Sequence, residues 1–507
     1  MNKGKTFWLI VIILIIASFF RLYQIKTMPP GLYPDEAMNG NNALEALRTG
    51  QFKVFYPENN GREGFFINTQ ALFLKFFGAN SPSQISQGET WEGKPWILRL
   101  PSAIFGILTV LGIYLLAAEL FSSEAGLLSA FLLATTFWHI NFSRIGFRAI
   151  LAPFFLIFAL YFLIKSIRSK KPPRSFILAI LGGIFYGFGF YTYIAYRITP
   201  LLLLLFPFFF PRDKKFWRAV AVFLFFTFIT ALPIGIYFLK NPADFFGRTS
   251  QVSIFNSGTP LKDLGLNILK TAAMFNIRGD SNWRHNYSSW PELFWPVGIL
   301  FVIGIIIGVK KLREKQKLNH QNSEPDKNEP RREKFAYLVS FLWLVLAAVP
   351  AVISNESLPH ALRSILMIPP TIIFSAAGGL WLYKFLKKRS TVGIAKLLSF
   401  AFLLTLAAAT YITYFVLWAN NPNTADAFSQ NYVTLSKEIS GLPTNIPKYV
   451  VVNATGVLVR SIPMPAQTVM FITDTYEPSA QQAKKIFYVL PQNENIIPAE
   501  AIRVYLQ

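Results

Sequence analysis

The sequence contains no cysteine and comparatively few charged residues. The absence of cysteine from all 507 residues excludes disulfides, thiolate metal sites and cysteine nucleophiles. Charged residues make up 15% of the chain, whereas soluble domains contain about a quarter. The four histidines are scattered, which argues against a His-rich metal site. These shortages make a membrane protein the first class to consider.

Long hydrophobic runs take the place of charge. Hydrophobic residues make up 53% of the chain, Phe alone occurs 50 times, and the mean hydropathy is +0.39. By length and composition, roughly eleven runs are candidate membrane spans: 6–23, 97–120, 125–142, 149–165, 176–194, 198–211, 217–239, 292–309, 336–354, 364–384 and 394–418. The run 198–211 is short and contains three prolines, which predicts a broken helix.

The net charge of +23 reports topology rather than nucleic-acid binding, because the basic residues lie mostly between hydrophobic runs. Basic clusters fall in the connections 165–174, 211–218, 310–335 and 385–393, which places these connections and the N-terminus in the cytoplasm. The first run lacks a small-residue cleavage site, so we interpret it as an uncleaved anchor rather than a signal peptide. The prediction is a multi-pass plasma-membrane protein.

The predicted organisation has two parts. Residues 1–419 form the membrane module, with long outer loops at 24–96 and 240–291 and a cytoplasmic loop at 310–335, whose polar stretch 313–334 is expected to be disordered. Residues 420–507 form a small α/β domain on the outer side. It is predicted to contain a helix near 426–440 and strands at 448–452, 468–472 and 486–490.

Asp35 and Glu36 are the most informative pair in the first outer loop. They follow a Pro-rich turn and begin a helix that runs to Gly50 and is expected to lie at the membrane surface. One interpretation makes Asp35 an N-cap and Glu36 a partner of the helix dipole. The other makes the carboxylate a general base that takes a proton from an acceptor hydroxyl. The two interpretations are compatible.

Arginines near span ends are the second signal. Arg62 lies between two glycines beside Glu63, and Arg144 and Arg148 share a short outer turn. Their guanidinium groups match phosphate oxygens. The alternatives are arginines that reach outer lipid headgroups or, for Arg62, a surface ion pair with Glu63.

Two further outer segments carry similar residues. His360 and Arg363 are three positions apart and share a face if the segment is helical. Arg197 follows a Tyr-rich stretch that includes Tyr193, which is either a sugar platform or an aromatic belt.

At these residues the sequence resembles the GT-C glycosyltransferases, in particular the protein O-mannosyltransferase and aminoarabinose (lipid A) transferase superfamily. The resemblance covers roughly residues 1–420. It is carried by five segments: Asp35-Glu36, Gly61-Arg62-Glu63, Arg99-Leu100-Pro101, Phe142-Ser143-Arg144 and Pro359-His360-Ala361-Leu362-Arg363.

The resemblance implies an all-α polytopic fold of the GT-C type with juxtamembrane helices on the outer face. It implies a polyprenyl-phosphate sugar donor and transfer with inversion. Asp35 would be the catalytic base, with Glu36 as its neighbour. The donor phosphate would contact Arg62, Arg144, Arg148 and Arg363, and the substrate would contact Glu63, Tyr193, Arg197 and His360.

We therefore predict a membrane glycosyltransferase that works on the outer face of the membrane, in contact with membrane lipids and without nucleic acid. The sugar and the acceptor, whether protein, lipid or glycan, stay open, as does a divalent cation, which Asp35 and Glu36 would bind through oxygen. The alternative is a transporter or flippase of a lipid-linked or anionic substrate. Transporters place ionisable residues at mid-membrane and often show repeats, whereas the charges here lie at span ends.

Overall fold

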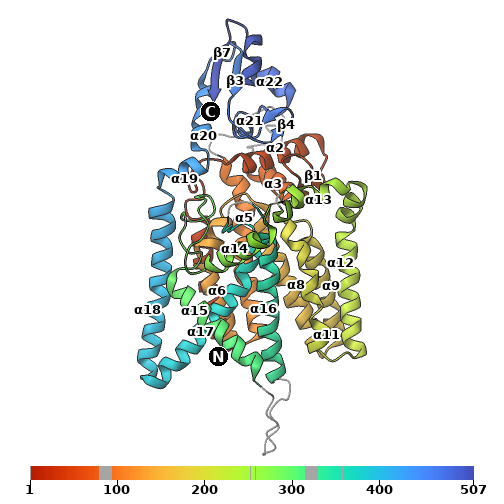
Figure 1. The fold of residues 1–507 in the computed structure, drawn as a ribbon, viewed down its shortest axis with the longest axis vertical. Coiled ribbons are helices and arrows are strands. Elements are labelled where there is room, and N and C mark those ends of the chain that lie inside the picture. Colours follow the sequence, from red (N-terminus) through yellow and green to blue (C-terminus); the bar gives the residue numbers. More distant parts are fainter. Residues whose placement is uncertain (1, 79–93, 252, 257, 315–328, 356–357) are drawn as a thin grey trace, which may run out of the picture.

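The computed structural model describes residues 2–78, 94–251, 253–256, 258–314, 329–355 and 358–507. It is a long helical bundle with a small mixed region on one end (Figure 1). The helix α2 (Pro34–Thr49) and the C-terminal elements lie at that end, and the N-terminus lies at the other. We call these the α2 end and the N-terminal end.

Eight helices among the described residues are long and apolar enough to cross a membrane. The prediction of a polytopic, mainly helical membrane protein is therefore confirmed. They are Lys3–Leu22 (α1), Pro95–Leu120 (α5), Arg148–Arg168 (η1 Arg148–Ile150 with α8 Leu151–Arg168), Lys214–Lys240 (α12), Trp295–Arg313 (α15), Arg332–Val352 (within α16, Glu329–Val352), Ile365–Arg389 (η4 Ile365–Met367 with α17 Ile368–Arg389) and Val392–Trp418 (α18 Val392–Tyr411 with the π-helix Ile412–Trp418).

The other three predicted spans are helical but shorter or interrupted. The run 125–142 divides into α6 (Ser123–Ala134) and α7 (Phe137–Phe142), and 176–194 becomes α9 (Pro172–Gly189). The predicted broken helix is confirmed, since it consists of η2 (Ile194–Ile198), α10 (Pro200–Leu203) and α11 (Phe206–Phe209). A total of eleven spans stays a prediction.

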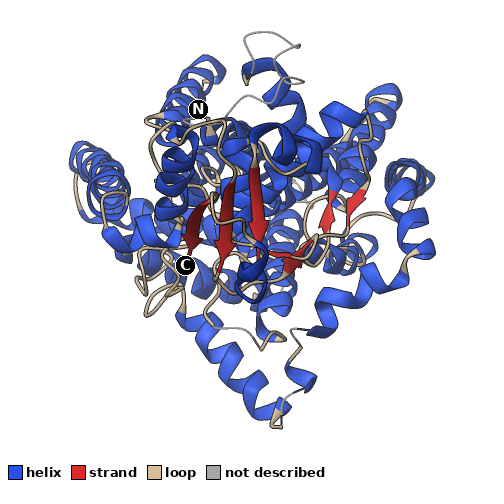
Figure 2. Cartoon of the chain, turned by 90° about the horizontal axis from the view of Figure 1, so that it is seen from above, coloured by secondary structure: helices blue, strands red, loops and turns tan. Residues whose placement is uncertain are grey.

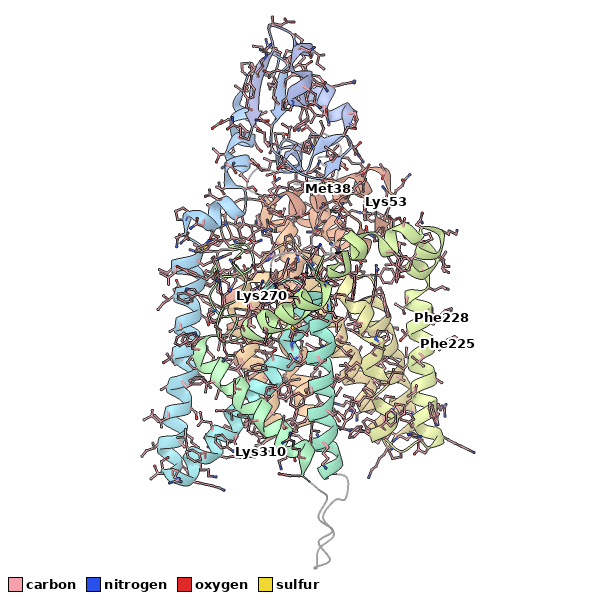
Figure 3. All side chains as sticks on the ribbon, viewed as in Figure 1. Met38, Lys53, Phe225, Phe228, Lys270 and Lys310 are labelled. Carbon is pink, nitrogen blue, oxygen red and sulfur yellow. The ribbon has the colours of Figure 1, made fainter. Side chains whose placement is uncertain are left out.

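Side chains on the outside of the bundle are apolar, as a bilayer requires. Phe225 and Phe228 project from α12 (Figure 3), with 58% and 64% of their surface exposed. Helix α12 packs mainly against α9, and α18 stands beside the bundle (Figure 1). Large exposed apolar side chains on such helices are expected to face lipid rather than water.

The predicted outer loops form a layer over the α2 end. It contains α2, a two-stranded ribbon of β1 (Phe55–Tyr56) and β2 (Arg62–Glu63), and α3 (Gly64–Phe77). The second long loop contributes α13 (Pro242–Gln251), η3 (Ile254–Asn256) and α14 (Pro260–Ala273). Met38 and Lys53 lie at this end and Lys310 at the other (Figure 3). Of the loop 310–335, residues 315–328 lie outside the described residues.

The C-terminal elements pack directly on α2. A parallel sheet with the order β6-β3-β7 stands above the bundle (Figure 2). The elements are α19 (Pro422–Ala427), α20 (Gln430–Gly441), β3 (Lys448–Val452), β4 (Leu458–Val459), β5 (Ile462–Pro463), α21 (Ala466–Thr473), α22 (Pro478–Lys484), β6 (Ile486–Val489), η6 (Pro491–Ile496) and β7 (Ile502–Leu506). The predicted strand 468–472 is wrong, because this segment forms the buried helix α21 against α2.

Candidate functional site

Asp35 lies in the first turn of α2. Pro34 occupies the first helical position, where its fixed φ suits a helix start and no N–H is needed, and Tyr33 precedes it as the N-cap. Asp35 is therefore inside the helix, and the prediction that it is the N-cap is wrong. Its carboxylate accepts a hydrogen bond from the Asn59 side chain, which comes from the turn before β2. Asp35 is half-buried.

Helix α2 is largely buried, while its predicted position at the membrane surface stays a prediction. Asn39 donates to the carbonyl of Gly146 at 3.1 Å, and Asn41 donates to the side-chain oxygen of Gln467 in α21 at 2.9 Å. Buried amides need such partners, and here the partners come from two different parts of the chain. The helix is held between the membrane bundle and the C-terminal elements, which fixes the position of Asp35.

Glu36 faces a different environment from Asp35. Its side chain is fully buried. The carboxylate accepts hydrogen bonds from Nε and Nη2 of Arg99 at 3.1 and 2.9 Å and from the Gly146 N–H at 2.6 Å. The bidentate ion pair occupies both carboxylate oxygens. The structure therefore places Glu36 in a scaffold contact rather than in a catalytic position. Asp35 and Glu36 do not form a joint cation site.

Arg62 is likewise held by the scaffold. Its two terminal nitrogens donate to Asn39 at 2.7 Å and Asn42 at 2.5 Å, and the side chain is buried. Burial, with a smaller contribution from Arg148, lowers the pKa of Arg62 to about 10, and the charge of Asp35 opposes that shift. The guanidinium group joins β2 to α2, which leaves the predicted phosphate contact without support.

Arg144 also fails to match its predicted role. Its guanidinium donates to the backbone carbonyls of Phe20 at 3.1 Å and Met28 at 2.8 Å, and it lies over the rings of Tyr414 and Phe415. The side chain is fully buried. Arg144 therefore connects the end of α1 to the turn after α7, which leaves its predicted phosphate contact without support.

Four predicted site residues do come together. Oε2 of Glu63 accepts a hydrogen bond from Nε of Arg148 at 2.7 Å, and Oε1 of Glu63 lies 3.7 Å from Nη2 of Arg197. The guanidinium of Arg148 also lies over the ring of Tyr193. These residues come from β2, η1 and the segment around η2, so the cluster joins three distant stretches of sequence. One carboxylate between two arginines leaves a net positive charge.

A second cluster was not predicted from the sequence. Asp280, His285 and His360 offer one ligand atom each, and these atoms all lie within 4.8 Å of one another. Nδ1 of His285 lies 2.9 Å from Oδ2 of Asp280, and the two imidazole rings are 5.0 Å apart. Two imidazole nitrogens and one carboxylate oxygen are donors that a divalent ion such as zinc accepts.

The protonation states suit ligation. Burial lowers the pKa of His285, and burial together with the charge of His285 lowers that of His360 to about 3, so both imidazoles are neutral near pH 7. Although burial raises the pKa of Asp280, the hydrogen bonds from His285 and from the Asn282 N–H, together with the electrostatic effect of both histidines when they are protonated, lower it overall. Arg363 belongs to the same surroundings, since its backbone N–H points to Nδ1 of His360 at 3.4 Å.

Arg284 links this cluster to Asp35. Its guanidinium lies 3.5 Å from the centre of the Tyr33 ring, directly before α2, and its buried Nε has no hydrogen-bond partner among the described residues. Burial is the largest cause of the pKa shift of both Tyr33 and His285, and the charge of Asp35 favours the protonated form of each. Sequence reasoning missed Arg284, although the polar stretch 279–286 in the second outer loop was a usable signal.

A buried acid lies beneath the cluster. Oε1 of Glu292 accepts the Asp280 N–H at 3.0 Å, and Oε2 has no partner among the described residues. Burial raises the pKa of Glu292 well above its ordinary range, and the charge of Asp280 adds to the shift. The folded protein therefore keeps this carboxyl protonated at a pH where the unfolded chain has released the proton.

This difference predicts a pH-dependent stability. Because the unfolded state releases its proton first, Glu292 lowers the free energy of unfolding progressively as the pH rises above about 4.3. Glu292→Gln is expected to reduce that loss, so that the variant unfolds at a higher temperature than the original protein at pH 8 and at a similar temperature at pH 4.5. The unfolding temperatures of both proteins are measured between pH 4.5 and pH 8. The same pH dependence in both would contradict the raised pKa of Glu292.

Comparison with known proteins shows which fold the chain has. Residues 92–237 match the family model described as dolichyl-phosphate-mannose-protein mannosyltransferase. No curated protein matches the chain by sequence. Among solved structures, ArnT from Cupriavidus metallidurans bound to undecaprenyl phosphate is similar with a TM-score of 0.57 and 12% identity, over 96% of this chain and 90% of that chain.

The oligosaccharyltransferase of Archaeoglobus fulgidus is similar as well. With a tethered acceptor peptide, it gives a TM-score of 0.57 and 14% identity over 97% of this chain. The structure of the same protein in complex with zinc and sulfate gives a TM-score of 0.55 and 14% identity over 96% of this chain. The present chain spans 64% and 62% of those two chains, less than two thirds of their length.

The fold defines the class of protein: a polytopic membrane protein of the GT-C type. The resemblance to GT-C glycosyltransferases of the O-mannosyltransferase and ArnT kind, which the sequence predicted, is confirmed.

Proposed function

We propose that this protein transfers a sugar from a polyprenyl-phosphate donor to an acceptor, at a site on the α2 end of the bundle, with Asp35 as the base. One observation carries the proposal. Asp35 lies in the first turn of α2, two positions after Tyr33, the Arg284 guanidinium lies 3.5 Å from the centre of the Tyr33 ring, and Arg284 directly precedes His285 of the Asp280–His285–His360 cluster. A carboxylate beside cationic and metal-ligating groups suits attack on a sugar phosphate.

The chemistry is a single displacement. Asp35 takes the proton of an acceptor hydroxyl as its oxygen forms a bond to the anomeric carbon of the donor. The bond from that carbon to the lipid phosphate breaks, and the phosphate leaves with the electron pair. Because Glu36 is committed to Arg99, it does not supply a second carboxylate for a covalent intermediate. One displacement inverts the anomeric centre.

Arg284 and Arg363 are the residues we assign to the donor phosphate, in place of Arg62 and Arg144. Arg284 offers a buried nitrogen without a partner, and Arg363 lies next to His360. Positioned cations stabilise the negative charge that develops on a leaving phosphate. A divalent ion held by Asp280, His285 and His360 would neutralise the same charge when bound. The archaeal relative solved with zinc and sulfate supports this assignment.

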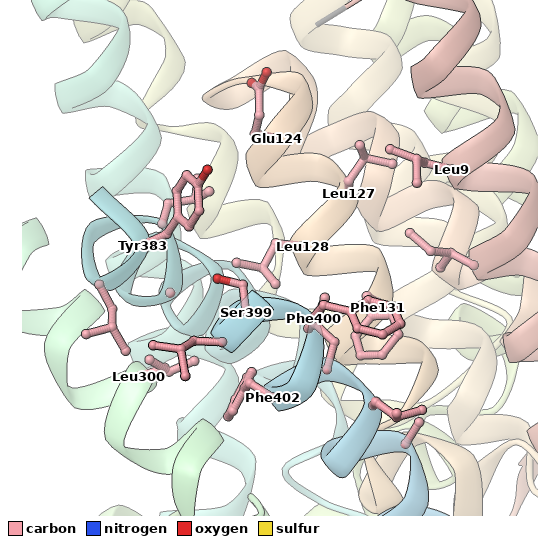
Figure 4. A pocket seen from close by; sticks show the side chains of 18 of the residues that line it. Leu9, Glu124, Leu127, Leu128, Phe131, Leu300, Tyr383, Ser399, Phe400 and Phe402 are labelled. Carbon is pink, nitrogen blue, oxygen red and sulfur yellow. The ribbon is translucent and has the colours of Figure 1, made fainter. Parts of the chain in front are cut away.

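Cavities along α18 give room for the lipid chain. An apolar cavity of about 590 Å³ lies between α1, α6, α17 and α18, with Leu128, Phe131 and Phe402 on its walls (Figure 4). A smaller one of about 50 Å³ lies further along α18 and touches Glu292 and Thr410. The larger apolar cavity suits a polyprenyl chain, the smaller one reaches Glu292, which accepts the Asp280 N–H, and ArnT was solved with undecaprenyl phosphate.

Metal retention tests the assignment of the three ligands. The purified protein is expected to retain zinc through desalting. Mutating a residue that only hydrogen-bonds to a metal ligand typically lowers metal affinity by roughly 10–100-fold. Because His360→Ala removes a ligand itself, it is expected to lower the affinity for zinc by at least that much. Bound zinc is measured by elemental mass spectrometry. Asp35→Asn serves as the matched control and should retain zinc, whereas loss of zinc in that variant would make Asp35 a ligand.

A vesicle assay separates the transferase from the transporter. Purified protein in sealed vesicles is given a polyprenyl-phosphate sugar and a hydroxyl acceptor. The transferase produces polyprenyl phosphate and a glycosylated acceptor, both detected by mass spectrometry. Movement of intact donor across the membrane without either product would instead establish the transporter. The same assay with protein, lipid and glycan acceptors identifies the acceptor class, and sidedness of the product tests the predicted outer-face location.

A further inference from the structure

A second charged cavity lies at the N-terminal end of the bundle, far from Asp35. Its volume is about 300 Å³, and it lies between the start of α9 and the start of α12. Lys170, Lys214, Lys215 and Arg218 line it. None of the described residues that line it is acidic, and the neighbouring Asp213 is occupied as the N-cap of α12, where it accepts the Phe216 N–H at 2.7 Å.

The cavity is built for an anion with a hydrocarbon part. Four cationic residues line one concave site, together with residues from the first turns of α9 and α12. Its remaining wall contains Phe176 from α9 and Ala219 and Val222 from α12. Arg218 lies 6.0 Å from the centre of the Phe176 ring, so charged and apolar parts are adjacent.

We propose that this cavity binds the phosphate of an anionic membrane phospholipid, with the start of an acyl chain against Phe176, Ala219 and Val222. Basic pockets between membrane helices at this position bind phospholipid headgroups in this way. The site is expected in the leaflet that the basic connections face, which the sequence predicts to be cytoplasmic. A general excess of basic residues explains charge at this end, but it does not explain a cavity that combines four cations with an apolar wall.

Binding here would join α9 and α12 at their N-terminal ends. Helix α12 packs mainly on α9, and its far end places Tyr237 and Phe238 against Phe55 of β1, with ring centres 5.1 and 5.3 Å apart. A lipid that bridges the two helices would therefore steady a helix that supports the ribbon carrying Arg62 and Glu63.

The test uses the purified full chain after delipidation, with lipid binding followed by native mass spectrometry. The probes are phosphatidylglycerol, phosphatidylcholine and inorganic phosphate. The variant Lys214→Gln/Arg218→Gln removes two cations from the cavity. The matched control, Lys387→Gln/Lys388→Gln, removes the same charge from the exposed end of α17 at the same end of the bundle.

We expect one phosphatidylglycerol to be retained in preference to phosphatidylcholine. The cavity variant should bind it about 25-fold more weakly, about fivefold for each cation removed, and the control should bind it normally. Equal weakening in both variants, or no preference between the two lipids, would overturn the proposal. Displacement of the lipid by millimolar inorganic phosphate would also overturn it in favour of a soluble anion. If the cavity variant fails to fold, the three probes on the original protein still decide the question.

Discussion

Asp35→Asn is expected to lower kcat for sugar transfer by roughly 10²–10⁴-fold, the usual contribution of a general base. Asparagine keeps the size of the side chain and can still accept the hydrogen bond from Asn59, but it cannot take up the acceptor proton. The KM for the donor is expected to change little, because we assign the phosphate contacts to Arg284 and Arg363. Release of polyprenyl phosphate from a labelled donor measures the rate.

The control for this prediction is Glu45→Gln on the same helix. Glu45 contacts Arg460 of the C-terminal elements and lies away from the site, so its variant tests whether any polar change in α2 lowers the rate. Equal unfolding temperatures for the three proteins would show that α2 keeps its place. Undiminished transfer by Asp35→Asn would remove Asp35 from the mechanism.

Glu36→Ala is expected to act on stability, with a loss of about 3–5 kcal/mol in the free energy of unfolding. The variant leaves the Arg99 guanidinium buried without its carboxylate, and it also leaves the Gly146 N–H without an acceptor. Unfolding in a fixed detergent, followed by circular dichroism, measures the change.

The matched variant is Glu45→Ala, which breaks the partly exposed pair with Arg460 and should cost less than about 1 kcal/mol. Similar costs for both variants would show that the buried pair is no stronger than a surface one. The assignment of Glu36 to a structural role and of Asp35 to catalysis would then lose its support.

The sequence predicted the class of fold because span length and charge asymmetry are local properties. Hydrophobic runs and basic connections can be read without knowing which helices touch. For short apolar runs the sequence does not decide between helix and strand, and residues 468–472 show why. Its β-branched and apolar residues match a buried strand, but the segment is equally apolar as a helix, and packing against α2 decides between them.

The site was predicted only in part, because the partners of a charged side chain come from distant sequence. Arg62 and Arg144 have the same local context as a phosphate-binding arginine, yet distant amides and carbonyls occupy them. Glu63, Arg148 and Arg197 do meet, in the layer at the α2 end. The Asp280–His285–His360 cluster was missed because the two histidines are 75 positions apart in the sequence.

Photo-crosslinking of the donor tests the central claim most directly. A polyprenyl-phosphate sugar with a photoreactive group beside its phosphate is bound to the purified protein, and the labelled peptides are sequenced. We expect labels in the segments around Tyr33, Arg284 and His360, and competition by unlabelled donor. Specific labelling confined to other parts of the chain, with none of these three segments modified, would contradict a transfer site built around Asp35.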